Sequence, residues 1–137
     1  MTKAFEYRHI VSFQETNLVG NVYFTNHLAW QGRCREMFLK ESAPDILNQL
    51  ASGLSLATVN CSCEYFAELC AFDEVIIRMR LQEIALNRIK LSFEYFRATE
   101  LIAKGEQMVA CMKRDGEKLS AVPVPDSLSA ALAPFAA

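Results

Sequence analysis

The chain has 137 residues, of which 52% are hydrophobic and 22% charged, which is enough for one core of ordinary size and predicts a single domain. The formal net charge is -2 and the 14 Lys and Arg residues are scattered, so the composition excludes a polybasic surface for nucleic acid. The apolar run at the N-terminus is too short for a secretory leader, and none reaches the roughly eighteen residues that span a bilayer. We therefore expect a cytoplasmic protein with neither membrane nor nucleic acid as partner.

The five cysteines are odd in number and are expected to stay reduced in that compartment, so the sequence predicts no disulfide. Cys61 and Cys63 share one face of a predicted strand, but no clustered His and no Cys-x-x-Cys pair completes a set of zinc ligands. We expect no metal and no cofactor, with the cysteines acting as small hydrophobes.

Aromatic and branched residues predict a first strand over 5–13, which ends at the polar residues 14–17. Apolar residues then recur at helical spacing and predict a main helix over 26–41, with Thr25 as its N-cap. A second, shorter helix is expected to begin around Pro44 and to end at Gly53.

From residue 54 onward the hydrophobic period changes from about 3.6 to 2, which indicates half-buried strands. The four predicted strands cover 57–65, 75–81, 89–95 and 101–114. Tight turns are expected at 86–87 and 115–116, and the tail 122–137, marked by prolines, is expected to lie over the surface with a short helix.

One strand, one main helix with an appendage and four long strands with short connections predict an α+β architecture, in which the helix covers one face of an antiparallel sheet. No repeat, linker or low-complexity segment divides the chain, so residues 1–137 are expected to form one domain. Such a sheet leaves an edge to be paired, and a homodimer is expected on that ground.

The stretch ETNLVGNVY at 15–23, followed by Arg33-Cys34-Arg35 on the predicted helix, resembles the signature of hotdog-fold thioesterases of the 4-hydroxybenzoyl-CoA thioesterase type. In that family the stretch typically reads Asp-Thr-Asp, two residues, Gly, then Val-Tyr, with Glu-Arg-Ala-Arg on the central helix. The resemblance covers nearly the whole chain. It implies a hotdog fold, with a long central helix wrapped by a five-stranded antiparallel sheet, and thioester hydrolysis.

Two acids of the family are missing, because the catalytic aspartate falls on Asn17 and the helix glutamate falls on Gly32. This double loss resembles the subgroup of hotdog thioesterases that accompany enediyne polyketide synthases in antibiotic biosynthesis. The resemblance implies hydrolysis of a β-keto polyene acyl thioester carried by an acyl carrier domain, followed by decarboxylation to a conjugated polyene. It also implies a homo-oligomer, either a dimer or a homotetramer.

Hydrolysis of an activated thioester depends on stabilising the oxyanion and holding a water, and neither task requires a carboxylate. Gly20 permits a tight turn into a helix whose first N–H groups are unpaired, and by resemblance the thioester carbonyl lies against backbone N–H groups near Tyr23 and Phe24. Asn17 is assigned to position water or substrate, and Arg35 to hold a carboxylate or enolate oxygen.

Each assignment has an alternative. Asn17 is also a residue type that forms turns by bonding its own backbone, and Arg35 could pair with Glu36 or with a strand carboxylate. A general acyl-CoA or acyl-carrier thioesterase would use His27 or Glu36 as its base, whereas Cys34 lacks a visible His partner and is expected in the core. A non-catalytic acyl-binding hotdog protein is a further alternative.

Gly32 inside the helix costs about 1 kcal/mol relative to alanine, so something is expected to need the space. One hypothesis is a channel for a long, flat acyl chain, lined by aromatic residues such as Trp30 and Phe38; the other is close packing against a strand or a symmetry mate.

Four basic residues of the middle strands are candidates for a rim that docks an acidic carrier domain, or for a solvated face. These are Arg78, Arg80, Arg88 and Lys90.

Overall fold

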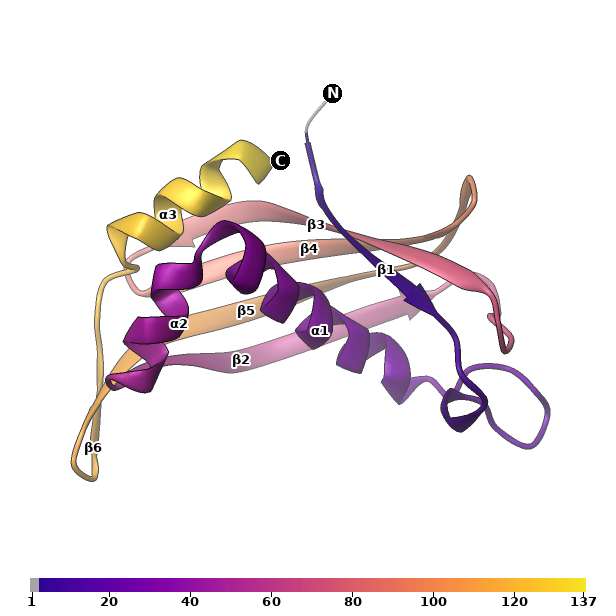
Figure 1. Ribbon diagram of the computed structural model, residues 1–137, viewed down its shortest axis with the longest axis horizontal. Helices are drawn as coiled ribbons and strands as arrows, with labels where there is room; N and C mark the ends of the chain where they lie inside the picture. The colour runs from indigo at the N-terminus through magenta and orange to yellow at the C-terminus, as the bar shows by residue number, and fades with distance from the viewer. Residues whose placement is uncertain (1–2) are drawn as a thin grey trace.

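The structure, a computed structural model, describes residues 3–137 (Figure 1). The strands are β1 (Phe5–Ile10), β2 (Leu54–Tyr65), β3 (Glu74–Ala85), β4 (Arg88–Arg97), β5 (Glu100–Asp115) and β6 (Lys118–Ala121). The helices are α1 (Thr25–Ser42), α2 (Pro44–Ala51) and α3 (Asp126–Leu132), with short 3-10 helices η1 (Phe13–Glu15) and η2 (Ala133–Phe135).

The strands form one antiparallel sheet in the order β1-β3-β4-β5-β2, and β6 pairs with β5 beside this path. The predicted architecture, a main helix across one face of such a sheet, is confirmed (Figure 1). The five predicted strands form this path, and the structure adds a sixth, because the chain turns back at Gly116, which adopts a φ of +64°, and runs along the end of β5 as β6. All four residues of β6 are exposed, so this strand has no buried alternation that would mark it in the sequence.

Helix α1 lies across one face of the sheet (Figure 1). Strands β3 and β4 alternate buried and partly exposed residues as predicted, and their buried residues face the helix. The core formed between these layers includes the fully buried residues Cys34, Ile77, Met79, Phe93 and Tyr95. A buried hydrogen bond helps to fix the helix over the far edge of the sheet; it runs from the Gln31 Nε2 to the Ser62 carbonyl oxygen of β2 at 2.9 Å.

Strand β2 departs from the prediction of a half-buried strand. Its second half is mostly exposed, and a bulge between Thr58 and Asn60 breaks the strict alternation seen in the sequence. The reason is its position, because β2 is the outer strand of the sheet and pairs only with β5. The chain therefore presents a long unpaired edge.

The two ends of the chain also differ from the prediction. Strand β1 stops at Ile10, and residues 13–15 form η1 instead of continuing the strand. The tail contains the expected short helix, but it closes the core instead of lying over the surface, since Leu128 and Leu132 are buried. The Phe135 ring packs edge-on against Phe38, with 5.8 Å between the ring centroids.

Two glycines make a matched test of this packing. A Cβ on Gly105 would overlap the Gln31 amide and the Ser62 carbonyl oxygen, whereas a Cβ on Gly32 meets no atom within 4 Å. Gly105→Ala is expected to lower the free energy of unfolding by about 1–3 kcal/mol through overpacking. Gly32→Ala is expected to raise it by up to about 1 kcal/mol through helix propensity. Urea denaturation of both variants measures the difference, and equal effects would contradict this account of the two sites.

Candidate active site at the start of helix α1

The loop 16–24 joins η1 to α1 and folds on itself through its own polar groups. The Asn17 N–H donates to the Asn21 carbonyl at 2.9 Å, and the Gly20 N–H donates to the Asn17 carbonyl at 3.0 Å. Gly20 has a φ of +92°, so the tight turn expected there is confirmed and requires a residue without a Cβ.

Asn17 is exposed, and its side chain acts partly as the turn-forming alternative describes. Its Oδ1 accepts the Val19 N–H at 3.0 Å. None of the hydrogen bonds among residues 3–137 uses its Nδ2, which is therefore available to donate to a bound molecule. A structural role for Oδ1 and a binding role for Nδ2 are compatible in one amide.

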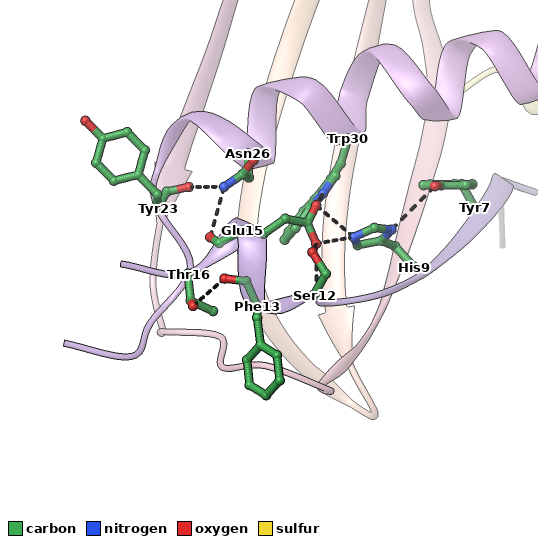
Figure 2. A network of polar contacts seen from close by, with 9 residues as sticks. All are labelled: Tyr7, His9, Ser12, Phe13, Glu15, Thr16, Tyr23, Asn26 and Trp30. Atoms are coloured by element: carbon green, nitrogen blue, oxygen red, sulfur yellow. Dashed lines mark hydrogen bonds and ion pairs between the residues drawn. The ribbon is translucent and has the colours of Figure 1, made fainter. Parts of the chain in front are cut away.

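Glu15 connects this loop to β1 and α1, an arrangement that the sequence analysis did not predict (Figure 2). Its carboxylate accepts the Trp30 Nε1–H of α1 at 2.7 Å and lies 2.8 Å from His9 Nε2 of β1. The Ser12 N–H donates to the same carboxylate at 2.9 Å. The Glu15 carbonyl oxygen accepts the Tyr23 N–H at 2.8 Å. One residue thereby ties β1, the loop and α1 together.

Burial by itself raises the pKa of Glu15, but the hydrogen bonds from the Ser12 N–H, His9 and Trp30 outweigh it and hold the pKa below its ordinary value of 4.5. The carboxylate is therefore ionised at neutral pH. All the groups that contact it are donors in the protein's own scaffold, so Glu15 positions the loop and does not replace the missing catalytic acid.

The start of α1 has no side-chain cap. Phe24 takes the N-cap position with helical backbone angles, so the prediction of Thr25 as N-cap is wrong. The Asn26 side chain bonds backwards instead, to the Glu15 carbonyl at 2.9 Å and the Tyr23 carbonyl at 3.2 Å. The Asn26 N–H also donates to the Tyr23 carbonyl at 3.0 Å, whereas the Phe24 N–H has no such bond among residues 3–137.

The two backbone donors expected from the resemblance are not equivalent. The Tyr23 N–H is consumed by the Glu15 carbonyl, so the assignment of Tyr23 as an oxyanion donor is corrected. The Phe24 N–H has no hydrogen-bond partner among residues 3–137 and lies at the positive end of the helix dipole. Phe24 is therefore the candidate donor.

Arg35 is held by neutral groups, since its Nη1 donates to Thr58 Oγ1 at 3.2 Å and to Gln107 Oε1 at 3.1 Å. It forms no ion pair with Glu36, which is exposed and pairs with Arg33 at 3.0 Å. Burial lowers the pKa of Arg35, and the nearby Glu36 charge opposes this shift. The position of Glu36, directed to solvent in an ion pair, does not favour it as a catalytic base.

The structure does not bring Arg35 to the oxyanion donor within one subunit. At a rise of about 1.5 Å per residue, Phe24 and Arg35 are about 16 Å apart along the helix axis. One guanidinium cannot reach a thioester carbonyl at Phe24 over that distance. The sequence predicted that Asn17, Phe24 and Arg35 act together. Within this chain, Arg35 lies too far from Phe24 for both to contact one thioester carbonyl.

The three residues predicted to line a channel along α1 do not lie on the same surface of the helix. Gly32 faces open space, as the channel hypothesis requires. Trp30 and Phe38 do not line that space, because both are buried on the core side of the helix; Trp30 bonds Glu15 and Phe38 packs against Phe5 at 5.6 Å. The expectation that these two aromatics bind substrate is corrected. A helix buries one stripe, and Gly32 lies on another.

Cys34 lies fully buried in the core, as expected, and burial raises the pKa of its thiol to about 12, which removes it as a nucleophile.

Across residues 3–137, no group of three or more His, Cys, Asp or Glu side chains is placed to hold a metal ion. In the same part of the chain, no helix is long and apolar enough to cross a membrane.

Three of the four basic residues predicted to form a docking rim are paired with carboxylates. Carboxylates pair with Arg78 (Glu6, 2.7 Å), Arg80 (Glu94, 2.6 Å) and Lys90 (Glu106, 3.4 Å). These pairs lie on the sheet face opposite α1. The solvated-face alternative therefore describes this surface better than a basic docking rim.

Comparison with known proteins places this geometry in a family. Residues 11–132 match the Thioesterase-like superfamily. The chain belongs to this superfamily. A putative esterase of Aquifex aeolicus is 27% identical over 116 residues, covering 85% of this chain and 90% of the relative. A 1,4-dihydroxy-2-naphthoyl-CoA hydrolase of Nostoc punctiforme is 26% identical over 129 residues, covering 91% and 84%.

Among solved structures, the dynemicin thioesterase superposes with a TM-score of 0.95 and 48% sequence identity, covering 98% of this chain and 99% of that one. Crystal structures of that protein report induced-fit and allosteric effects upon polyene binding. The fold is thus the hotdog fold, the chain is a thioester hydrolase, and the predicted resemblance to the enediyne-associated subgroup is confirmed.

The role of Glu15 in this thioesterase predicts a pH-dependent stability. Because the pKa is lower in the folded state, the stabilisation by Glu15 is fully present above about pH 4.5 and is lost as the pH falls through the folded-state pKa. Glu15→Gln is expected to lower the free energy of unfolding by about 1–3 kcal/mol at pH 7, and the deficit is expected to shrink in acid. Denaturation curves across this pH range measure it.

Glu36→Gln is the matched control, since Glu36 is exposed in a surface ion pair and its replacement is expected to cost under about 0.5 kcal/mol. A Glu15→Gln deficit that stays constant from neutral to acidic pH would contradict an ionised anchor.

Proposed function

We propose that this protein hydrolyses a β-keto polyene acyl thioester held on the acyl carrier domain of an enediyne polyketide synthase, and that the released acid loses CO2 to give a conjugated polyene. The observation that carries the chemistry is the Phe24 N–H, unpaired among residues 3–137 at an uncapped helix start; the loop before it carries Asn17, whose Nδ2 forms no hydrogen bond in the same part of the chain. The similarity to the dynemicin thioesterase, 48% identity over nearly the full length, supports the substrate class.

In this proposal the thioester carbonyl accepts the Phe24 N–H, and the helix dipole stabilises the oxyanion that forms when water attacks. Asn17 donates from Nδ2 to the substrate or to the attacking water and takes no proton; the water loses its proton to solvent, and the thiolate that leaves takes a proton from solvent. One preorganised donor of this kind is worth about 10²–10³ in rate, similar to the contribution of a general base. The absent acids therefore do not prevent catalysis of an already activated ester.

The acyl chain is proposed to run along α1 toward Gly32, where the surface is open. At about 1.5 Å of rise per residue, the path from Phe24 to Gly32 is about 12 Å long, which suits an extended conjugated chain. Arg35 lies one turn farther along and contributes to this acyl path in the proposal. Decarboxylation then proceeds in the released β-keto acid, which loses CO2 without help.

The partner expected from the free edge is a second copy of this chain. Strand β2 presents its unpaired edge over its whole length and exposes 43% of Val59 near its centre. A two-fold axis through this region would continue the sheet into the partner and place the open flank of α1 beside the interface. We propose a homodimer through β2, which a homotetramer would contain.

The Phe24 donor has a direct test. Phe24 has a φ of -56°, which proline also adopts, so Phe24→Pro deletes the N–H while preserving the backbone angle. It is expected to lower kcat about 10²–10³-fold against a synthetic 3-oxoacyl thioester. Phe24→Ala removes the same ring but keeps the N–H, and is expected to lose far less. Similar losses in the two variants would exclude the backbone donor.

The activity itself is tested by mass spectrometry of products after mixing the protein with a polyketide synthase that carries its tethered polyene. Release of free or decarboxylated polyene is expected, and Asn17→Ala is expected to suppress it. Asn48→Ala, an exposed asparagine on α2, serves as control. A chain that stays tethered with active protein present would favour the non-catalytic acyl-binding alternative.

A further inference from the structure

A small hollow of about 210 Å³ opens beside the start of α1. It lies between the end of the loop, the first turn of the helix and the segment that follows β2. Its lining residues are Asn21, Val22, Phe24, His27, Tyr65, Ala67, Glu68 and Leu69. Because Phe24 carries the candidate oxyanion donor, this hollow adjoins the position proposed for the thioester carbonyl.

His27 is the buried polar residue of this hollow. Only 3% of its surface is exposed, and neither Nδ1 nor Nε2 has a hydrogen-bond partner among residues 3–137. Aromatic rings surround it, with Tyr65 edge-on at 4.7 Å and Trp30 and Tyr95 at 5.1 and 5.6 Å between ring centroids. Such an arrangement holds the ring in place without satisfying its nitrogens.

The nearest backbone acceptor does not supply the missing bond. The Phe24 carbonyl lies close enough to favour the protonated ring, but it accepts the Tyr65 hydroxyl at 2.8 Å, and neither His27 nitrogen reaches hydrogen-bond geometry. Burial is the larger effect and lowers the pKa of His27 below its ordinary value of 6.5, so the imidazole is neutral at neutral pH. It then offers one donor and one acceptor.

Asn21 also lines this hollow, and its buried Oδ1 has no hydrogen-bond partner in the described part of the chain. Buried polar groups in folded proteins are nearly always hydrogen-bonded, and leaving one unpaired is costly. Two such groups around one hollow therefore indicate a ligand that both donates and accepts hydrogen bonds. A saturated acyl chain can do neither.

We propose that the hollow is a subsite for the oxygen at C3 of the acyl chain, bound as ketone or enol by His27 and Asn21. This inference rests on the proposed function and deepens it, because it makes His27 the residue that selects 3-oxoacyl thioesters over saturated ones. The His27 N–H donates to the C3 oxygen, and an enol hydroxyl donates to Asn21 Oδ1 or to the other imidazole nitrogen.

The spacing along the helix agrees with this assignment. His27 follows Phe24 by three residues, so the two lie on one face of α1, about 4.5 Å apart along the axis. The two oxygens of a flexible 3-oxoacyl thioester can spread over a comparable distance. The thioester oxygen can then occupy the Phe24 donor while the C3 oxygen enters the hollow.

The experiment compares 3-oxooctanoyl and octanoyl thioesters of N-acetylcysteamine. The measured quantity is the ratio of their kcat/KM values in wild type and in His27→Phe, which keeps a buried aromatic ring and removes both nitrogens. Wild type is expected to prefer the 3-oxo thioester, and His27→Phe is expected to reduce this preference about 3- to 10-fold, the worth of about one hydrogen bond. The melting temperature of His27→Phe is expected to equal or exceed that of wild type, because an unpaired buried polar group is removed.

Two further variants separate this role from others. Tyr95→Phe removes a hydroxyl that donates to the His27 carbonyl at 2.6 Å, and it is expected to change both kcat/KM values in proportion. His27→Gln retains a donor and an acceptor but does not titrate, so it is expected to keep most of the preference. Loss of hydrolysis of both thioesters in His27→Gln, together with loss of a limb of the pH profile, would overturn the subsite and make His27 a general base.

The outcomes also distinguish this inference from the proposed function. Hydrolysis of both thioesters by wild type without preference, or with a preference that His27→Phe leaves intact, would overturn the subsite alone and indicate that the hollow holds only water. Failure of wild type to hydrolyse either thioester or to release the tethered polyene would overturn the proposed function.

Discussion

The position of the loop before α1 depends on one ionised carboxylate. Glu15 accepts hydrogen bonds from Trp30 on the helix and from the Ser12 backbone, contacts His9 on β1, and binds the Tyr23 N–H through its carbonyl oxygen. This anchor adds to the backbone bond from the Val22 N–H to the Leu69 carbonyl oxygen at 2.8 Å, which also holds the loop against the core. The same bond that fixes Tyr23 consumes its N–H, which leaves Phe24 as the donor at the helix start.

The difference between the bonded Tyr23 N–H and the unbonded Phe24 N–H suggests how a thioesterase can lose both family acids and retain a candidate active site. The remaining groups are neutral or part of the backbone: the Phe24 N–H, the Asn17 amide and the uncharged His27 ring. In the proposed function they act through fixed dipoles, which stabilise charge without taking up a proton themselves. Arg35 of α1 is held by Thr58 and Gln107 far along the helix, so in the proposed function it contacts a different part of a long substrate.

The spacing of hydrophobic residues in the sequence predicted much of the fold. The alternation in 75–81 and 89–95 predicted β3 and β4, and the helical spacing of Leu28, Cys34, Phe38 and Leu39 predicted α1, because each element buries one face against the other. The strand β2 and the short helix of the tail were predicted, but the burial expected for each was wrong for the same physical reason. An outer strand has no second neighbour to bury it, and a tail is covered or exposed according to contacts made by residues distant in sequence, such as Phe38 against Phe135.

The sequence by itself determined the α+β arrangement, the missing acids at Asn17 and Gly32 and, through its motif, the thioesterase family. Only the tertiary structure decided which polar groups are already used. It paired Tyr23 with Glu15 and Trp30 with the same residue, buried Phe38, separated Arg35 from Phe24, and left His27 and Asn21 unpaired at one hollow. Hydrogen bonds between residues far apart in the chain leave no periodic signal, so the donors that a fold consumes and those that it leaves for a ligand are visible only once the chain is folded.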